Sequence, residues 1–555
     1  MAIEHLLSGR LSGHPLALAA RALRQPRIAA LGADVLRAEL GMTGLPELIE
    51  GNERLEPSAS PRQGRAPREG NESVEPPTAP SWAPTCQTLT NAFLQGRSTP
   101  ERVLEYVFSE ADRLAQRQPL LGCLWTRDEL GAREAARASS QRYARGKPKS
   151  PIDGVPVLIK EQLAVRGLPR RLGHELPSPA PMQHDATLVA RLREAGAIVV
   201  GQTAMTELGM SPIGVNPNRP ALRNPHHVER AAGGSSTGAG IAAAVGLTPI
   251  SVGADGGGSI RIPAAICGVF GLKPSFGRVS RKGDAFTGSV NHLGPLGPST
   301  RDLAVFLDAV AAPDPGDPLS LAAPTPAPGA FERALRRSVR GLRIGVDPKE
   351  WRDADSAIAN AGEQALKALE QAGATLVEIT IPLAQSALPI GALTIAAESY
   401  ACYSHAFERH REAFGLDVQA FMLMVNQLSA REYLWAQTLR ERLRVQVARS
   451  FGDVDALALP TTAKTGLPLI SSDDRTGRLD AQGVQAMCRY TFLANLTGLP
   501  AGTVPVGLDA DGLPMGLQIV GDAWDEPTVL ALMAELERSG AGRVLRPPHH
   551  VDLLG

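Results

Sequence analysis

Residues 233–263 read GGSSTGAGIAAAVGLTPISVGADGGGSIRIP, and this stretch decides the fold. Two glycine-rich turns, at 233–238 and 253–258, enclose an alanine-rich segment that predicts a helix and an apolar run, 247–252, that predicts a strand. Glycine loses more conformational entropy on folding than any other residue, so glycines packed into two short turns require a reason. Either the turns bind phosphate or they serve acyl-transfer chemistry.

Phosphate binding has little support. The sequence contains no GxxxxGK[ST], and no GxGxxG followed by an acidic ribose anchor, so no nucleotide cofactor is expected. The acyl-transfer alternative fits better, because three consecutive glycines precede Ser259. Backbone N–H groups in such a turn can converge on the oxygen that becomes negative in a tetrahedral intermediate.

A serine nucleophile needs a base, and no histidine is tied locally to this stretch. The apolar run 155–159 predicts a buried strand, and Lys160 follows it directly. Desolvation would lower the pKa of such a lysine from its reference value of about 10.4 and leave it neutral enough to accept a proton. From the pattern alone, a strand-end lysine that extends its ammonium group to solvent is the alternative.

Composition excludes several classes of protein. Lys plus Arg and Asp plus Glu are both 57, so there is no basic excess for nucleic acid or an anionic membrane. The five cysteines form no CxxC pair and none has a histidine at zinc spacing, so neither a disulfide framework nor a metal site is expected. No apolar run is long enough to predict a membrane span. The sequence thus predicts a soluble, cytoplasmic protein.

The chain divides into three parts by pattern. Residues 1–50 predict a small helical extension, and the proline-rich stretch 51–85 predicts a flexible linker. Strands alternate with helices through residues 86–555, which predicts a layered α/β domain. The extension suits a dimerisation or docking element, and a homodimer is one arrangement that it allows. Simple packing of the extension on the main domain explains the pattern equally well.

Several blocks, in one order along the chain, resemble the amidase signature family. They are GGSSTGAGIAAAVGLTPISVGADGGGSIRIPAAICGVFGLKPSFGRVS, PIDGVPVLIKEQLAVRG, DATLVARLREAGAIVVGQT, NHLGPLGPSTRDLAVFLDAV, LALPTTAKTGLP and YTFLANLTGLPAGTVPVG. The resemblance covers most of residues 86–555. It implies the amidase signature fold, a mixed β-sheet core with helices on both faces. It also implies hydrolysis of a small-molecule amide by a Ser-cisSer-Lys triad without a cofactor.

The resemblance assigns roles to individual residues. Ser259 would be the nucleophile, Ser235 the bridging serine after a cis Gly234–Ser235 peptide, and Lys160 the base. The remaining expected roles are oxyanion binding by Gly256, Gly257, Gly258 and Ser259, network support by Ser236 and Gly234, and substrate binding by Gly209 and Met210. Gly256 departs from the family, which usually has a larger residue there, and this change lengthens the glycine run.

Three alternative functions remain. GSSTG at 234–238 fits the GxSxG motif of α/β-hydrolases, but the preceding residues are polar rather than strand-like. A tRNA-dependent amidotransferase subunit shares the triad, yet normally has an acidic residue where this chain reads Met487-Cys488-Arg489-Tyr490. A catalytically silent binding protein is disfavoured by the intact triad.

The nature of the acyl group is the least determined feature. An insertion at about 380–450 concentrates aromatic residues and methionines in a chain with only 4% aromatic residues. This concentration suggests an apolar or aromatic acyl pocket. Ordinary packing between helices would explain the same residues.

Overall fold

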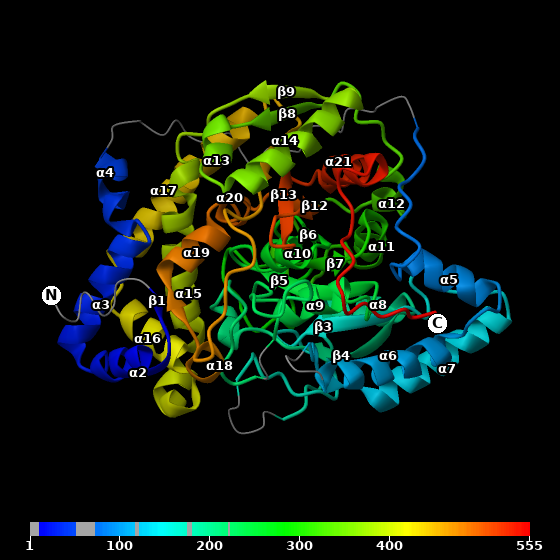
Figure 1. Cartoon of the computed structure of the whole chain (residues 1–555), viewed down its shortest axis with the longest axis horizontal. Helices are drawn as coiled ribbons and strands as arrows, with labels where there is room; N and C mark the ends of the chain where they lie inside the picture. Colours follow the sequence, from blue (N-terminus) through cyan, green and yellow to red (C-terminus); the bar gives the residue numbers. More distant parts are fainter. Residues whose placement is uncertain (1–9, 51–72, 117–120, 175–179, 220–221, 555) are drawn as a thin grey trace.

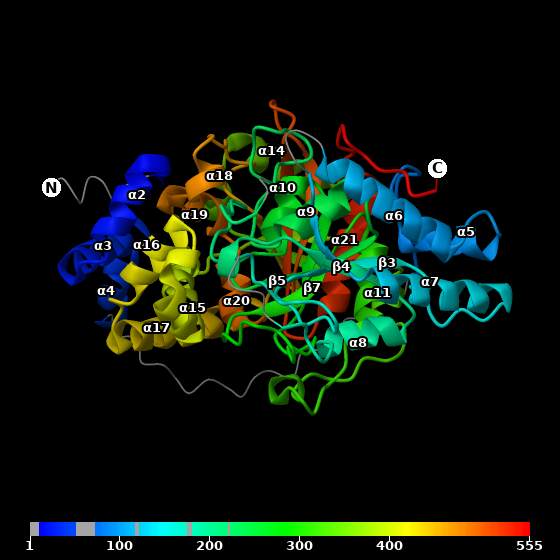
Figure 2. The ribbon, with the colours of Figure 1, turned by 90° about the horizontal axis from the view of Figure 1, so that it is seen from below.

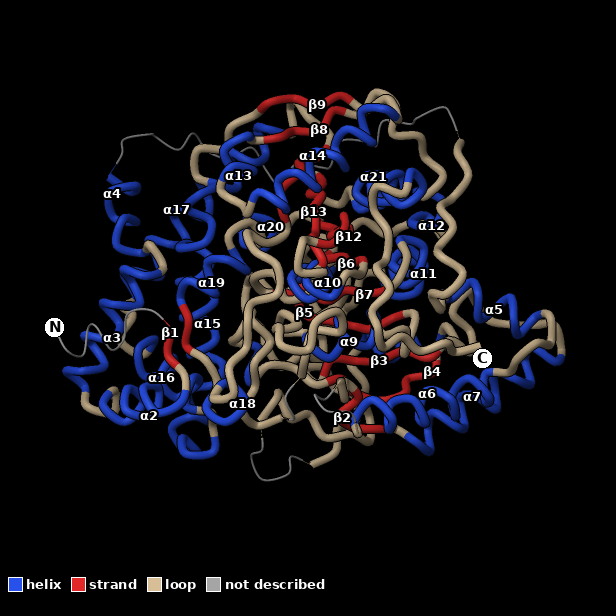
Figure 3. Tube along the Cα trace, viewed as in Figure 1, coloured by secondary structure: helices blue, strands red, loops and turns tan. Residues whose placement is uncertain are grey.

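A mixed β-sheet forms the centre of the molecule. The computed structural model describes residues 10–50, 73–116, 121–174, 180–219 and 222–554. Within these ranges, eleven strands form one sheet in the order β2-β4-β3-β5-β7-β6-β12-β13-β10-β8-β9 (Figure 3). Their bounds, in that order, are Leu124–Arg127, Ile198–Thr203, Pro156–Lys160, Ile250–Asp255, His292–Gly297, Phe270–Lys273, Ala501–Leu508, Pro514–Gly521, Ala456–Pro460, Arg343–Val346 and Thr375–Glu378.

Strands β3 and β5 position Lys160 and the glycine-rich loop that carries Ser259. They pair in parallel, with Val157 opposite Ile250 and Ile159 opposite Val252. Every residue of both strands is buried, including Lys160 and Asp255 at their ends. The second strand begins at Ile250 and ends at Asp255, three residues later than the predicted run 247–252. Because the strands are parallel, the Lys160 end of β3 and the glycine-rich loop after β5 lie at the same edge of the sheet.

Helices cover the sheet on both faces. In Figure 2, α9 (Thr237–Ala244) and α10 (Arg261–Cys267) lie on one side of the central strands, and α8 (Thr187–Glu194) and α11 (Thr300–Val310) on the other. The other helices on the sheet region are α5 Cys86–Leu94, α6 Pro100–Ala115, α7 Glu129–Ala144, α12 Ala330–Ala334, α13 Pro348–Arg352, α14 Ser356–Gln371 and α21 Glu526–Ser539. Thr99 caps the N-terminus of helix α6, because its hydroxyl accepts a hydrogen bond from the Arg102 N–H at 3.2 Å.

A second, wholly helical layer lies beside the sheet. The insertion folds into α15 (Ala387–His410), α16 (Leu416–Val425) and α17 (Ala430–Ser450). Three short helices, α18 Asp473–Thr476, α19 Ala481–Cys488 and α20 Phe492–Thr497, join this layer to the sheet. Among the described residues, no helix is long and apolar enough to cross a bilayer.

The N-terminal extension packs against this helical layer. It forms α2 (Gly13–Ala22), α3 (Pro26–Glu39) and α4 (Leu45–Glu50), which lie beside α16 and α17 in both views of the ribbon (Figures 1 and 2). Before them, β1 (Arg10–Leu11) pairs antiparallel with β11 (Leu479–Asp480). The packing alternative for the extension is therefore what the structure shows within one chain. Most of the predicted linker, residues 51–72, lies outside the described residues.

Candidate active site

Lys160 ends β3 inside the protein rather than at its surface. Its Nζ donates to Ser235 Oγ at 2.7 Å and to the Ala254 carbonyl at 3.3 Å, and the side chain is fully buried. Burial lowers the pKa of Lys160 to about 7, although Asp284 and Asp255 act in the opposite direction. A large fraction of Lys160 is therefore neutral near pH 7, and the alternative of a solvent-exposed ammonium group is wrong.

The serine loop brings Ser235 to this lysine. The Gly234–Ser235 peptide is cis, as the resemblance implies. Ser235 is buried, and its carbonyl accepts the Thr206 N–H at 3.2 Å. Ser236 connects the two glycine-rich turns: its N–H donates to the Ser259 carbonyl at 3.3 Å, and its Oγ accepts the Ala254 N–H at 3.3 Å. These bonds fix Ser235 and Ser259 relative to the end of β5.

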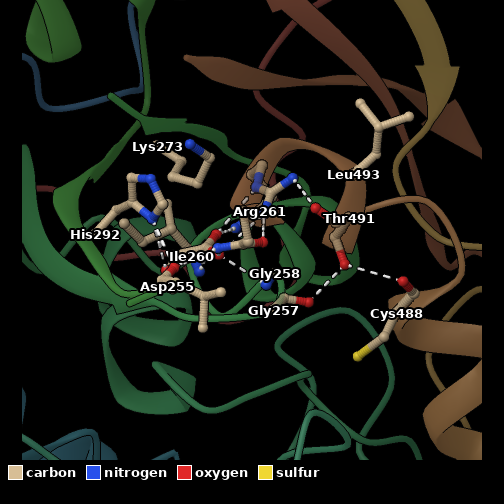
Figure 4. A network of polar contacts seen from close by, with 12 residues as sticks. Asp255, Gly257, Gly258, Ile260, Arg261, Lys273, His292, Cys488, Thr491 and Leu493 are labelled. Carbon is tan, nitrogen blue, oxygen red and sulfur yellow. Dashed lines mark hydrogen bonds and ion pairs between the residues drawn. The ribbon is translucent and has the colours of Figure 1, made fainter. Parts of the chain in front are cut away.

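The loop that carries Ser259 is folded around a buried carboxylate (Figure 4). Asp255 Oδ1 accepts the Gly258 N–H at 2.7 Å, and Oδ2 accepts the Ile260 N–H at 3.1 Å. The Arg261 guanidinium binds the same carboxylate through Nε at 3.0 Å and Nη2 at 2.9 Å. The Gly258 N–H is thus already donated to Asp255, so of the four expected oxyanion donors we retain only Gly256, Gly257 and Ser259.

Arg261 and Asn495 keep Asp255 ionised although it is buried. Arg261 also donates to the Thr491 carbonyl at 2.9 Å and to Asn495 Oδ1 at 2.6 Å. Asn495 Nδ2 in turn donates to Asp255 Oδ1 at 2.9 Å. Burial by itself would raise the pKa of Asp255, but these donors hold it well below its usual range. A fully paired network of this kind rigidifies the loop it surrounds.

Close packing explains the run of three glycines. A Cβ on Gly257 would lie 2.6 Å from the Phe492 ring, and a Cβ on Gly256 would lie 2.8 Å from Ile395 Cδ1. Gly258 has a φ of +123°, a conformation that other residues rarely adopt. The departure of Gly256 from the family thus accompanies an isoleucine of α15 that fills the space of a larger side chain.

Ser259 opens onto a cavity of about 140 Å³. Its wall includes Gly257, Gly209 and Met210, so the two residues expected to bind substrate lie beside the expected nucleophile. The helical insertion contributes Ala392, Ile395, Ala396, Val418, Phe421 and Met424. Other members of its aromatic cluster, among them Tyr403 and Phe407, are buried in the helical core. Some aromatic residues and methionines of the insertion therefore line the cavity, as the pocket explanation expects, and others pack between helices.

Three supporting residues were not singled out by the sequence analysis. Asp255 and Arg261 flank the glycine run, and Asn495 lies in the block 490–507. An acid close to the end of a predicted buried strand and an arginine six residues later are a usable signal, since two buried charges require pairing. Asn495 lies 240 residues from Asp255 and had no such local signal.

Known proteins share both the sequence and the fold. The sequence profile of the Amidase family matches residues 105–530. The chain belongs to the amidase signature family. It is 32% identical over 473 residues to a fatty acid amide hydrolase of Medicago truncatula, covering 84% of this chain and 77% of that protein. It is 36% identical over 475 residues to a glutamyl-tRNA(Gln) amidotransferase subunit of a Roseiflexus species, with coverages of 81% and 94%.

Solved structures agree with this membership. A bacterial aryl acylamidase of the amidase signature family has a TM-score of 0.73 and 26% identity, covering 83% of this chain and 96% of that one. The family and the mixed-sheet fold predicted from the signature are confirmed. The protein is an amide-hydrolysing enzyme.

Proposed function

We propose that this amidase cleaves its substrate through an acyl-enzyme on Ser259. Neutral Lys160 accepts the proton of Ser235 while Ser235 accepts the proton of Ser259, whose oxygen attacks the carbonyl carbon. Collapse of the tetrahedral intermediate breaks the C–N bond, and the proton returns through Ser235 to the leaving nitrogen. Water then attacks the acyl-enzyme by the same relay and releases the acid. The 2.7 Å contact between Lys160 and Ser235 carries this proposal.

The oxyanion is assigned to backbone donors of the glycine loop. Gly256, Gly257 and Ser259 are the candidates, since Asp255 occupies the Gly258 N–H. The Gly257 carbonyl accepts the Thr491 hydroxyl at 2.6 Å, which orients the neighbouring peptide plane (Figure 4). Donors fixed in advance stabilise a developing oxyanion without reorganisation during the reaction.

The acyl group that suits this cavity is apolar. Most side chains on its wall are aliphatic, aromatic or methionine. Five charged residues also line it: Glu39, Glu207, Asp417, Arg478 and Asp480. Asp480 accepts the Gly483 N–H at 2.8 Å. Glu207 and Asp417 are occupied as well, because the Gly415 N–H donates to Glu207 at 2.8 Å and the backbone N–H of Arg478 donates to Asp417 at 3.1 Å. Burial raises the pKa of both carboxyls, which weakens them as partners for a substrate ammonium group. This argues for an apolar acyl amide over glutamine.

Covalent labelling tests the mechanism directly. The wild-type protein, treated with a fluorophosphonate and weighed intact, should gain one adduct. Ser259→Ala should abolish that adduct, whereas Lys160→Ala and Ser235→Ala should slow its formation at least about a hundredfold, the usual range for loss of a general base. Ser539→Ala, an exposed serine at the end of α21, is the matched control and should label like wild type. An adduct that survives Ser259→Ala would refute the assignment.

A substrate panel tests the acyl class. Long-chain fatty acyl, aryl acyl and small aliphatic anilides, together with glutamine, would be compared by kcat/KM. The apolar cavity predicts the highest values for the acyl anilides with extended apolar groups. Preferential hydrolysis of glutamine would instead support the amidotransferase-like function that the Roseiflexus relative suggests.

A further inference from the structure

One wall of the active-site cavity comes from outside the family-matched region. The profile match begins at residue 105, yet Gly32, Val35, Leu36 and Glu39 line the same cavity as Ser259. Their spacing of three, one and three residues places them on a single face of α3. Leu40 and Met42, just after the helix, continue this wall.

Helix α3 is attached to the helical layer at several points. Arg37 Nε lies 2.6 Å from Glu432 Oε1, and Arg37 Nη2 donates to the Gln427 carbonyl at 3.0 Å. The pairing with Glu432 raises the pKa of Arg37. Arg442 Nη1 donates to the Leu48 carbonyl of α4 at 2.6 Å. The lining face of α3 is therefore held in a defined position rather than resting loosely on the cavity.

The extension also shares a hydrophobic core with the insertion. Leu16, Leu23, Ala33 and Leu45 are buried in one cluster with residues of α15, α16 and α17. Figures 1 and 2 both place α3 on the side of α15 away from β5. The cavity thus extends from the catalytic loop toward α3, and α3 forms its far end.

We propose that α3 of the N-terminal extension closes the far end of the acyl-binding cavity and sets the length of the apolar acyl chain that the enzyme accepts. This inference rests on the proposed function, since it assumes that the acyl group of the Ser259 adduct enters the cavity. The side chains that meet the end of the acyl chain are then Val35 and Leu36 of α3, which line the same cavity as Phe421 and Met424 of the insertion.

The test uses alkyl fluorophosphonates of increasing chain length on the full-length protein. These probes report directly on Ser259 and need no turnover. Val35→Trp should lower the second-order labelling rate of a dodecyl probe about tenfold or more, the effect expected when one or two methylene groups no longer fit an apolar pocket. The labelling rate of the ethyl probe should stay unchanged. Ala38→Trp places the same side chain on the exposed face of α3 and should change neither rate.

A second variant covers the case in which tryptophan disturbs the fold. Val35→Ala enlarges the same end of the cavity and should shift the preferred probe toward longer chains. Equal loss of ethyl and dodecyl labelling in Val35→Trp, or no change in chain-length preference in either variant, would overturn the proposal. Absence of labelling by every probe on wild type would instead refute the Ser259 mechanism, so the two failures are distinguishable.

Discussion

The low pKa of Lys160 makes the pH dependence of the enzyme a quantitative test. The proposed relay needs the neutral amine, and burial lowers the pKa of this group to about 7. With that pKa, the neutral fraction rises from about one-tenth at pH 6 to about nine-tenths at pH 8. We therefore expect kcat/KM, and the rate of fluorophosphonate labelling, to rise about tenfold between these pH values and then to level off.

A lysine with an unshifted pKa would give a clearly different pH profile. A lysine with the reference pKa of about 10.4 would give a rise of about a hundredfold over the same interval and no plateau below pH 9. Such a profile would refute the role of burial in activating Lys160. A profile that is flat from pH 6 to 9 would refute lysine as the base.

A variant that removes a nearby carboxylate tests whether the rise of kcat/KM with pH comes from Lys160. Asp284 raises the pKa of Lys160, so Asp284→Asn should move the acidic limb to lower pH. This variant matters because burial also raises the pKa of Asp417, which lines the cavity, to about 7. Asp284 is not among the groups that shift Asp417, so a limb that stays in place in Asp284→Asn would point away from Lys160.

Three further outcomes follow from packing. Leu16→Ala, which empties a fully buried site between the extension and α16, should lower the free energy of unfolding by about 2–5 kcal/mol in denaturant titration; no loss would contradict a shared core. Gly257→Ala should abolish labelling of the nucleophile because its Cβ would lie 2.6 Å from the Phe492 ring, and normal labelling would contradict that geometry. Gly256→Thr should lower kcat/KM because its side chain would crowd Ile395, and adding Ile395→Ala should restore kcat/KM. If Gly256→Thr alone has the kcat/KM of the wild type, the loop can accommodate a side chain at position 256.

The parts of the site predicted from sequence are those with local signals. The two glycine turns and the serine after the second turn lie close together in sequence, and the strand that ends in Lys160 is a short apolar run 75 residues before Ser235. Each of these features follows from strand or turn chemistry within its own segment. The parallel pairing of β3 and β5 then brings their ends together. Cavity residues such as Gly209 and Met210 came from family resemblance and lie on the wall beside Ser259.

Contacts between distant segments could not be derived in the same way. Asn495 meets Asp255, and Ile395 meets Gly256, only because the whole sheet and the helical layer are assembled. The same limit applied to residues 10–50, whose helical pattern predicted the helices but not their position. The apolar face of a helix indicates that the helix packs against another part of the protein, but it does not indicate which part.

The two parts of the site, the catalytic loops and the far end of the cavity, are built in different ways. The residues of the proposed relay lie at the ends of buried strands and in the loops that follow them, where hydrogen bonds to Asp255 restrict movement. The far end of the cavity is instead built by helices of the insertion and the extension, whose contacts are mainly apolar. Apolar packing tolerates volume-conserving substitutions, whereas a buried ion network tolerates few. We therefore expect substitutions on the cavity-lining face of α3 to alter the acyl group accepted by the proposed site more readily than substitutions around Asp255, which should impair the proposed relay itself.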